Sequence, residues 1–331
     1  MPHAPFDLLP DELVFHIVDL LEPVANGPEW PSRYSLGPIC LVSRRFCRLV
    51  QPLLWRKVVV KAGPKMATFT RKTPQRLAAA VRNIVILATA GHHLAQPPLK
   101  RLLRTLPHVE EVEVFGSADI EMDVFEHAHN LKRLAGPAGL RATQPFLLPH
   151  LENITVPPSS AILRHLTSTT VPALRVVIFD TVNFGPSNAV EFDMSILPQL
   201  EYLQANWPSA ARFEDVYRPR SSAVVLARFT YWDLFYSHIP PAIGQLRHVS
   251  LGQLDYPRSH NGIGDTLLDM LERCHGLKTL TLPRDFVEVE KLLKYASVRG
   301  VKIVWSDTRH EPRLDGAFYE YAKELRARGE V

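Results

Sequence analysis

A short apolar pattern recurs along most of this chain and restricts the folds that it can adopt. The pattern is an apolar residue, two mostly polar residues, an apolar residue, one spacer and a further apolar or small residue. Its clearest copies are VEEVEV (from 109), LENITV (151), LRVVIF (174), LRHVSL (246) and LKTLTL (277). Fainter copies are VRNIVI (81), LKRLAG (131), LEYLQA (200), LARFTY (226) and VKIVWS (301). Because the last two apolar positions alternate as they do in a strand, each copy predicts one short strand.

The spacing of the ten copies indicates repeats. Their first positions follow one another at intervals of 20 to 31 residues, close to the period of about 20 to 29 residues in leucine-rich repeats, which this array resembles. One copy could arise by chance in any leucine-containing α/β protein, but ten in order make chance a poor explanation. The resemblance implies a solenoid of stacked parallel strands.

The array departs from the leucine-rich-repeat pattern at one position. That family places Asn or Cys after the apolar pattern to build a hydrogen-bonded ladder, and this chain does not. Other residues occupy such positions, namely Ser117, Ser159, Val182, Leu254 and Asp285. We therefore expect an irregular leucine-rich-repeat-like array over residues 81–311.

Helical segments are expected between and after the repeats. Two segments, 265–276 and 285–300, begin with Asp and end near Gly, as capped helices do. The amphipathic segment 312–331 is predicted to be a C-terminal capping helix.

The N-terminal segment LLPDELVFHIVDLLE (8–22) predicts a helix with a broad apolar face. Its apolar side chains cover an arc of about 180°, although about 100° is enough to face one core. Pro10 fits the first helical turn, where Asp11 and Glu12 complement the positive helix end. A stretch rich in proline and glycine follows, and we interpret it as an insertion over about residues 22–35.

A second helix is predicted within ICLVSRRFCRLVQPLLW, which starts at Ile39. Ser43 can cap this helix. Its apolar face carries Phe46, Leu49, Val50 and Leu53, and its polar face carries Arg44, Arg45, Arg48 and Gln51. Two or three short helices in about 55 residues are marginally stable alone, so this unit needs a neighbour.

The N-terminal residues resemble the F-box, a motif that binds the Skp-family adaptor of cullin–RING ubiquitin ligases. Leu9, Pro10, Glu12, Leu13, Ile17 and Leu20 match its opening LPxELxxxIxxxL. LVSRRF (41–46) matches its LVCKxW-like second block, with Phe46 in place of the usual Trp and Ser43 in place of the frequent Cys. The following CRLVQPLLWRKVVV looks like the ending common in fungal F-box proteins.

The resemblance implies an adaptor-binding surface on residues 5–57, with 58–80 as a linker or first repeat cap. The contacting set implied by motif position is Leu9, Pro10, Leu13, Leu41, Val42 and Phe46. In helix-in-groove recognition a few such buried anchors supply most of the affinity. Some of these residues must instead belong to the internal core, and the sequence leaves open which.

Composition and charge restrict the cellular setting. The 46% hydrophobic and 22% charged contents are those of a folded soluble protein. The net charge of +4 is small and is not gathered into a lysine-rich run, so it gives no electrostatic case for nucleic acid or an anionic membrane. We see no signal peptide and no membrane-spanning stretch, and the three cysteines form no CxxC or zinc framework. We expect a cytoplasmic or nuclear protein with reduced thiols.

Residues suited to catalysis or metal binding do not form a recognisable motif. The sequence has no GxSxG, P-loop, GxGxxG or HExxH. The pairs His92–His93 and His127/His129 lack neighbouring ligands at metal spacing, so we expect neither a metal nor a cofactor. Aromatic residues gather between 207 and 241, and core filling explains such clusters more often than binding does. The candidates there for target binding are Trp207, Tyr217, Trp232 and Tyr236.

Three functional hypotheses follow. The leading one is a non-catalytic substrate receptor whose F-box binds the adaptor and, through it, cullin, while the repeats bind an unknown protein target. The second is a scaffold that binds the adaptor outside a ligase. The third is a divergent α/β enzyme, which requires a pocket with paired polar groups.

Overall fold

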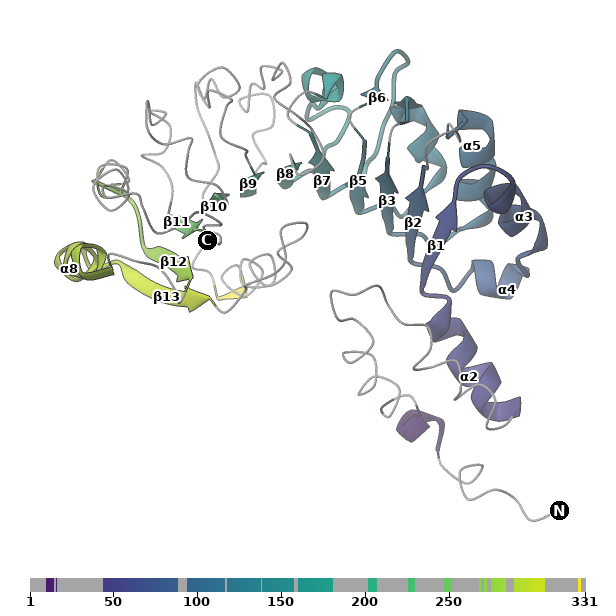
Figure 1. Cartoon of the computed structure of the whole chain (residues 1–331), viewed down its shortest axis with the longest axis horizontal. Coiled ribbons are helices and arrows are strands. Elements are labelled where there is room, and N and C mark those ends of the chain that lie inside the picture. The colour runs from purple at the N-terminus through teal and green to yellow at the C-terminus, as the bar shows by residue number, and fades with distance from the viewer. Residues whose placement is uncertain are drawn as a thin grey trace. The chain divides into compact units, whose positions relative to one another are not determined.

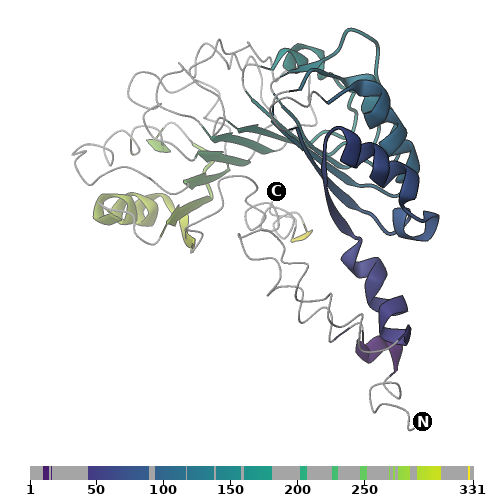
Figure 2. The ribbon, with the colours of Figure 1, turned by 45° about the vertical axis from the view of Figure 1, so that its right-hand side comes forward.

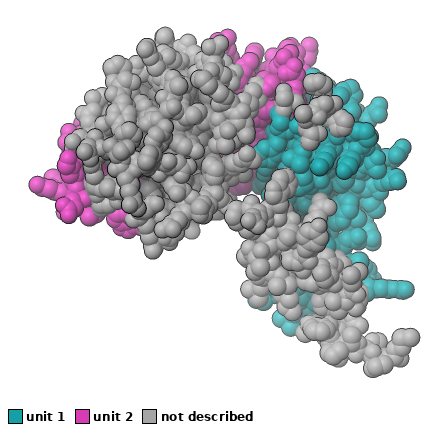
Figure 3. Space-filling view, in the orientation of Figure 1, with its two compact units in different colours: residues 1–117, 124–131 teal, residues 118–123, 132–331 magenta. Residues whose placement is uncertain are grey.

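The structure is a computed structural model, and the parts that it describes fall into two compact units. The described residues are 10–14, 16, 44–88, 94–116, 118–137, 139–157, 160–180, 202–206, 226–229, 247–251, 268, 271–272, 275–283, 289–306 and 327–328. Unit 1 comprises residues 1–117 and 124–131, and unit 2 comprises residues 118–123 and 132–331 (Figure 3). No helix within the described residues is long and apolar enough to cross a membrane.

Unit 1 contains parallel strands with helices on one side (Figures 1 and 2). Its strands are β1 (Lys57–Lys61), β2 (Asn83–Leu87) and β3 (Glu111–Phe115), and its helices beside them are α3 (Pro64–Lys72), α4 (Gln75–Ala78) and α5 (Gln96–Thr105). β2 pairs in parallel with both β1 and β3. Because parallel neighbours need a crossover connection, the helices between these strands follow from the pairing.

Helix α5 shows why these segments form helices against the sheet. Pro97 lies in its first turn, where a missing N–H costs nothing. Leu99, Leu102 and Leu103 are fully buried, and their spacing of three and four residues places them on one face. The helix is thus held by one apolar stripe.

Unit 2 has the same kind of strand arrangement as unit 1. Its strands are β5 (Arg133–Ala135), β7 (Asn153–Val156), β8 (Val176–Asp180), β9 (Tyr202–Asn206), β10 (Leu226–Phe229), β11 (His248–Leu251), β12 (Thr279–Pro283) and β13 (Lys302–Ser306). Each pairs in parallel with the next in chain order. A separate parallel pair joins β4 (Ile120–Glu121) to β6 (Leu140–Arg141).

Three further helices have described bounds outside the N-terminal region. They are the 3-10 helices η3 (Met122–His127) and η4 (Ala161–His165) and the α-helix α8 (Val289–Arg299). α8 ends at Arg299, directly before Gly300, and an end near this glycine is what the sequence predicts. Gly300 has a φ of 68°, and the N–H of Val301 donates to the carbonyl of Ala296 at 2.8 Å, which is the Schellman arrangement.

All ten predicted copies of the apolar pattern carry a strand, and the strand pairing is parallel as predicted. Two copies lie in a different register from the one predicted. Leu203 pairs with Ala227 rather than with Phe229, and Leu280 pairs with Ile303 rather than with Val304. Pairing with the preceding strand fixes the register here, because a shifted strand would place its side chains against different neighbours.

An eleventh copy, which is not among the ten predicted ones, precedes the others. Trp55, Val58 and Val60 follow the same spacing, and Val58 and Val60 are buried. Val58 pairs with Ile84 of the next copy. The segment 58–80, predicted to be a linker or a first cap, therefore begins inside a strand of the sheet.

Backbone hydrogen bonds link successive copies at the second position of the pattern. The carbonyl of Arg56 accepts from the N–H groups of both Arg82 and Asn83, each at 2.9 Å. The same double acceptance recurs at the carbonyls of Arg82, Lys132, Glu152 and Arg247. These bonds join neighbouring copies without the Asn or Cys side chain that the repeat family uses.

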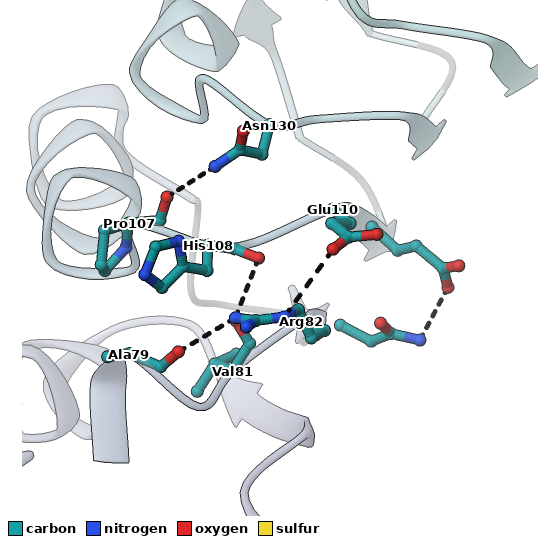
Figure 4. Close-up of polar contacts among 9 residues, drawn as sticks. Ala79, Val81, Arg82, Pro107, His108, Glu110 and Asn130 are labelled. Atoms are coloured by element: carbon teal, nitrogen blue, oxygen red, sulfur yellow. Dashed lines mark hydrogen bonds and ion pairs between the residues drawn. The ribbon is translucent and has the colours of Figure 1, made fainter. Parts of the chain in front are cut away.

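The side chain of Arg82 reinforces this link within unit 1 (Figure 4). Its guanidinium donates to the carbonyls of Ala79 at 2.9 Å and His108 at 3.4 Å. It also lies 3.7 Å from the carboxylate of Glu110. One partly exposed arginine thus joins the turn before β2 to the turn before β3.

Candidate functional site

The N-terminal helical turn begins just after Pro10. The carbonyl of Pro10 accepts from the N–H groups of Leu13 at 3.1 Å and Val14 at 3.2 Å, so Pro10 caps the turn and Asp11 is its first helical residue. Pro10 therefore immediately precedes the first helical residue, whereas the sequence analysis placed it within the first turn. Asp11 keeps its predicted position at the positive helix end.

This turn has an inward face and an outward face. Val14 is fully buried, whereas its neighbour Leu13 is 49% exposed. Pro10 is also exposed. A large aliphatic side chain that stays half exposed beside a buried one is available for contact with another molecule.

Helix α2 (Arg44–Leu54) supplies the second part of the candidate site. Val50 is fully buried, and Leu49 and Leu53 are partly buried. Arg44 and Arg48 are exposed on the other side. For these residues the predicted division of the helix into an apolar and a basic face is confirmed.

An ion pair brings the two sequence blocks together. Arg45 donates through Nε to Oδ1 of Asp11 at 3.0 Å, and its Nη2 contacts the same oxygen. From the sequence alone, Asp11 was expected only to complement the helix end and Arg45 only to lie on the polar face of its helix. Because 34 residues separate them, no local sequence rule pairs them.

We expect this ion pair to contribute modestly to stability. The two side chains are 27% and 51% exposed, and pairs at such positions contribute about 0.2–1 kcal/mol. A double-mutant cycle with Asp11→Ala and Arg45→Ala, followed by urea unfolding, measures the coupling. A coupling well above about 1 kcal/mol would show that the pair is shielded from solvent, contrary to this expectation.

The C-terminal end of α2 is fastened to the rest of unit 1. The ring of Trp55 stacks on that of Phe69 in α3, with centroids 5.8 Å apart and planes inclined by 23°. The guanidinium of Arg76 in α4 donates to Gln51 of α2 at 3.3 Å. These contacts attach α2 to the helices that cover the sheet.

The structure describes only part of the predicted binding set. Pro10 and Leu13 are exposed, as a contact role requires. The backbone of Phe46 belongs to α2, and its side chain lies outside the described part. Leu9, Leu41, Val42, Ser43 and the insertion 22–35 also lie outside the described residues. The same holds for the four candidate target-binding aromatics, Trp207, Tyr217, Trp232 and Tyr236, and for nearly all of the capping segment 312–331.

The histidines with metal-binding potential have other environments or lie outside the described residues. Nε2 of His127 lies 3.2 Å from Nη2 of Arg104. His129 is exposed, and residues 89–93, which include His92 and His93, are not described. Within the described part of the chain no three His, Cys, Asp or Glu side chains gather in a way that could hold a metal ion.

Comparison with known protein families identifies the N-terminal helices. Residues 6–61 match the model of the F-box-like family. The chain carries an F-box-like domain. The match includes the turn at Pro10, all of α2 and β1 up to its last residue, Lys61. The F-box-like domain therefore runs directly into the first strand of the sheet.

The F-box match gives a coarse functional class. F-box domains generally bind adaptors of the Skp1 type, and proteins of this family are generally interaction adaptors without enzymatic activity. That generalisation does not by itself exclude an activity in this chain. The 270 residues that follow Lys61 lie outside the F-box-like match.

Two further comparisons add little. A crystal structure of a protein from Bacteroides fragilis shares 13% identity, with a TM-score of 0.43 over 76% of this chain and 72% of that one. A similarity of that size does not identify the fold or the function. The search of curated proteins returned no match.

Proposed function

We propose that this protein is a substrate-recognition subunit of a Skp-cullin-F-box type ubiquitin ligase. Its F-box-like domain binds a Skp-family adaptor and, through it, cullin, while the repeats bind a protein target. The observation that carries the proposal is the F-box-like match together with the half-exposed Leu13 beside the fully buried Val14. A cytoplasmic or nuclear location belongs to the same proposal.

The adaptor-binding surface in this proposal is the outward side of the two F-box helices. Pro10 and Leu13 contribute from the first helix, joined by Leu9, and Leu41, Val42 and Phe46 contribute from the second block. A few apolar anchors that become buried in a groove account for most of the affinity of such interfaces. The Asp11–Arg45 ion pair supports the surface by holding the two helices together.

The strand array in this proposal is a leucine-rich-repeat-like solenoid over residues 81–311, closed by the segment 312–331. Its support is the chain-order parallel pairing of strands that recur with the apolar pattern. The target surface in this proposal includes the aromatics between 207 and 236. Tyr and Trp suit such a role because they combine a large apolar area with a polar group.

Substituting Leu13 tests the adaptor surface. We expect Leu13→Asp to weaken binding to a Skp-family adaptor at least tenfold, because a charge would be forced into an apolar groove. The melting temperature should stay close to that of the wild type, since Leu13 is half exposed. Co-purification and calorimetric titration measure binding to the adaptor, and thermal unfolding measures the melting temperature.

Two matched variants separate binding from folding. Leu147→Asp changes an equally exposed leucine, 50% against 49%, outside the F-box-like domain, and should leave adaptor binding unchanged. Val14→Asp places a charge at a fully buried position and should lower the melting temperature. Failure of the wild-type chain to bind the adaptor, or equal binding by Leu13→Asp, would contradict the proposal. Native complexes that contain adaptor without cullin would favour a scaffold outside a ligase.

A further inference from the structure

The net charge of the chain conceals a strong segregation of charge. Residues 30–109 contain 15 Lys and Arg and no Asp or Glu. The rest of the chain holds the other 23 Lys and Arg together with all 34 Asp and Glu. A value of +4 for the whole chain therefore averages a strongly basic segment with an acidic remainder.

The folded structure collects much of this positive charge on the helical layer of unit 1. Six exposed cationic side chains, here named the basic layer, come from α3, α4 and α5: Lys65, Arg71, Lys72, Arg76, Arg101 and Arg104. Figures 1 and 2 show these helices on the same side of β1, β2 and β3. The buried faces of the same helices are apolar, with Met66 in α3, Leu77 in α4 and three leucines in α5.

Helix stability explains only part of the basic layer. Cations in the last turn of a helix interact favourably with its dipole, and four of the six residues are in last turns. The same effect favours acidic residues in first turns, yet the first turns of α3, α4 and α5 contain none. Lys65 and Arg101 lie outside the last turns. Acidic residues are thus absent even from the first turns, where they would stabilise the helices.

Carboxylates do not neutralise the basic layer. Within the described residues, Arg45 and Arg82 form ion pairs with carboxylates, and no ion pair there involves the six side chains of the basic layer. Arg76 donates to the side-chain amide oxygen of Gln51, and Nη2 of Arg104 lies 3.2 Å from Nε2 of His127. The positive charge of this surface is therefore available to an anionic partner.

The surroundings of the basic layer favour the phosphate backbone of a nucleic acid as its binding partner, rather than a protein or a lipid bilayer. Among described residues 44–116 no large apolar side chain is exposed, so the layer lacks the apolar anchors on which protein interfaces and membrane insertion depend. Phosphate contacts require only cationic and polar donors. Exposed Thr68 and Gln75 lie among the cations, and four of the six are arginines, whose planar fork suits phosphate oxygens.

We propose that the basic layer binds nucleic acid through its phosphate backbone, without reading base sequence. Binding of this kind depends steeply on salt, since each contacted phosphate releases condensed counterions. Six contacts on duplex DNA predict a slope of about −5 for log K against log salt, or an affinity loss of about 10³-fold between 50 and 200 mM. The adaptor plays no part in this contact.

The test compares two variants that lose the same number of charges. The first changes Lys65, Arg71, Lys72 and Arg101 to Gln, sparing Arg76 and Arg104 because they bond within the fold. The control changes four exposed cations of unit 2 to Gln: Arg164, Lys278, Lys294 and Lys302. Fluorescence anisotropy of the full chain with a short labelled DNA duplex, over a range of salt, gives affinity and slope, and circular dichroism checks folding.

We expect the wild type to bind and the basic-layer variant to lose at least tenfold in affinity, with a slope shallower by about 3 to 4. The control should stay within about twofold, and a duplex of unrelated sequence should compete equally. Absence of wild-type binding, or an equal loss in the control, would overturn the proposal. So would preferential binding to phosphatidylserine vesicles or a loss of adaptor affinity in the basic-layer variant. Because Leu13→Asp should leave DNA binding intact, the two proposals can fail independently.

Discussion

Replacing Gly116 with alanine is expected to unfold a large fraction of the protein or to lower its melting temperature markedly. Gly116 has a φ of 99°, which costs any other residue about 1–2 kcal/mol. A Cβ at this position would also overlap the backbone carbonyl oxygen of Ala88. That oxygen cannot move easily, because the N–H of Ala88 donates to Phe115 at 2.8 Å and holds the ends of β2 and β3 together. We expect a total cost of about 2–5 kcal/mol.

Gly300 provides the matched control for this substitution. It also has a positive φ, 68°, but a Cβ there would have open space around it. Gly300→Ala should therefore cost only the backbone strain, about 1–2 kcal/mol. Thermal and urea unfolding give the loss of stability in each variant. The difference between the two losses is the cost of the overlap with Ala88. Equal losses of stability in the two variants would mean that β2 and β3 can move apart without a cost in free energy.

Phe125→Ala is the second substitution with a large expected effect. Phe125 is the largest of the fully buried side chains among the described residues. It lies in η3, and its backbone carbonyl accepts a hydrogen bond from the N–H of Ala128. Removing a fully buried phenyl ring forfeits its burial and leaves a cavity, at a cost of about 3–5 kcal/mol. Urea unfolding monitored by circular dichroism measures the loss.

Leu147→Ala is the control for Phe125→Ala. Leu147 is 50% exposed, so its truncation should change the free energy of unfolding by about 0.5 kcal/mol or less. Phe125→Leu should recover much of the loss, because it keeps most of the buried apolar volume. A cost below about 1 kcal/mol for Phe125→Ala would indicate that the surrounding side chains collapse into the space.

The sequence predicted the strands well because the apolar pattern depends only on nearby residues. Each of the ten copies became a strand, and the copy at Trp55 was visible in principle through the same spacing. Register was harder to predict. Around residues 224–231, VVLARFTY, apolar residues satisfy the pattern at two offsets, and only pairing between Ala227 and Leu203 selects one of them.

The candidate site could be predicted only where it depends on residues that are close together in the sequence. The broad apolar arc of the first helix indicated two faces, but Leu13 and Val14 lie next to each other within it. The sequence could not tell which of the two is buried, because burial depends on neighbours far along the chain. The Asp11–Arg45 ion pair was beyond prediction for the same reason, since its partners are 34 residues apart in the sequence. The sequence-level net charge also hid the basic layer, because opposite charges elsewhere cancelled it.

The parallel pairing of strands in chain order has a consequence for how the protein folds. Within each unit, every registered strand pair of the main sheet joins copies that are neighbours in sequence, with partners some 20 to 31 residues apart. The entropy lost on closing a loop grows slowly with its length, so each pairing step has nearly the same entropic cost. No strand need wait for a distant partner. Folding can begin at any well-packed copy and spread outward one neighbour at a time.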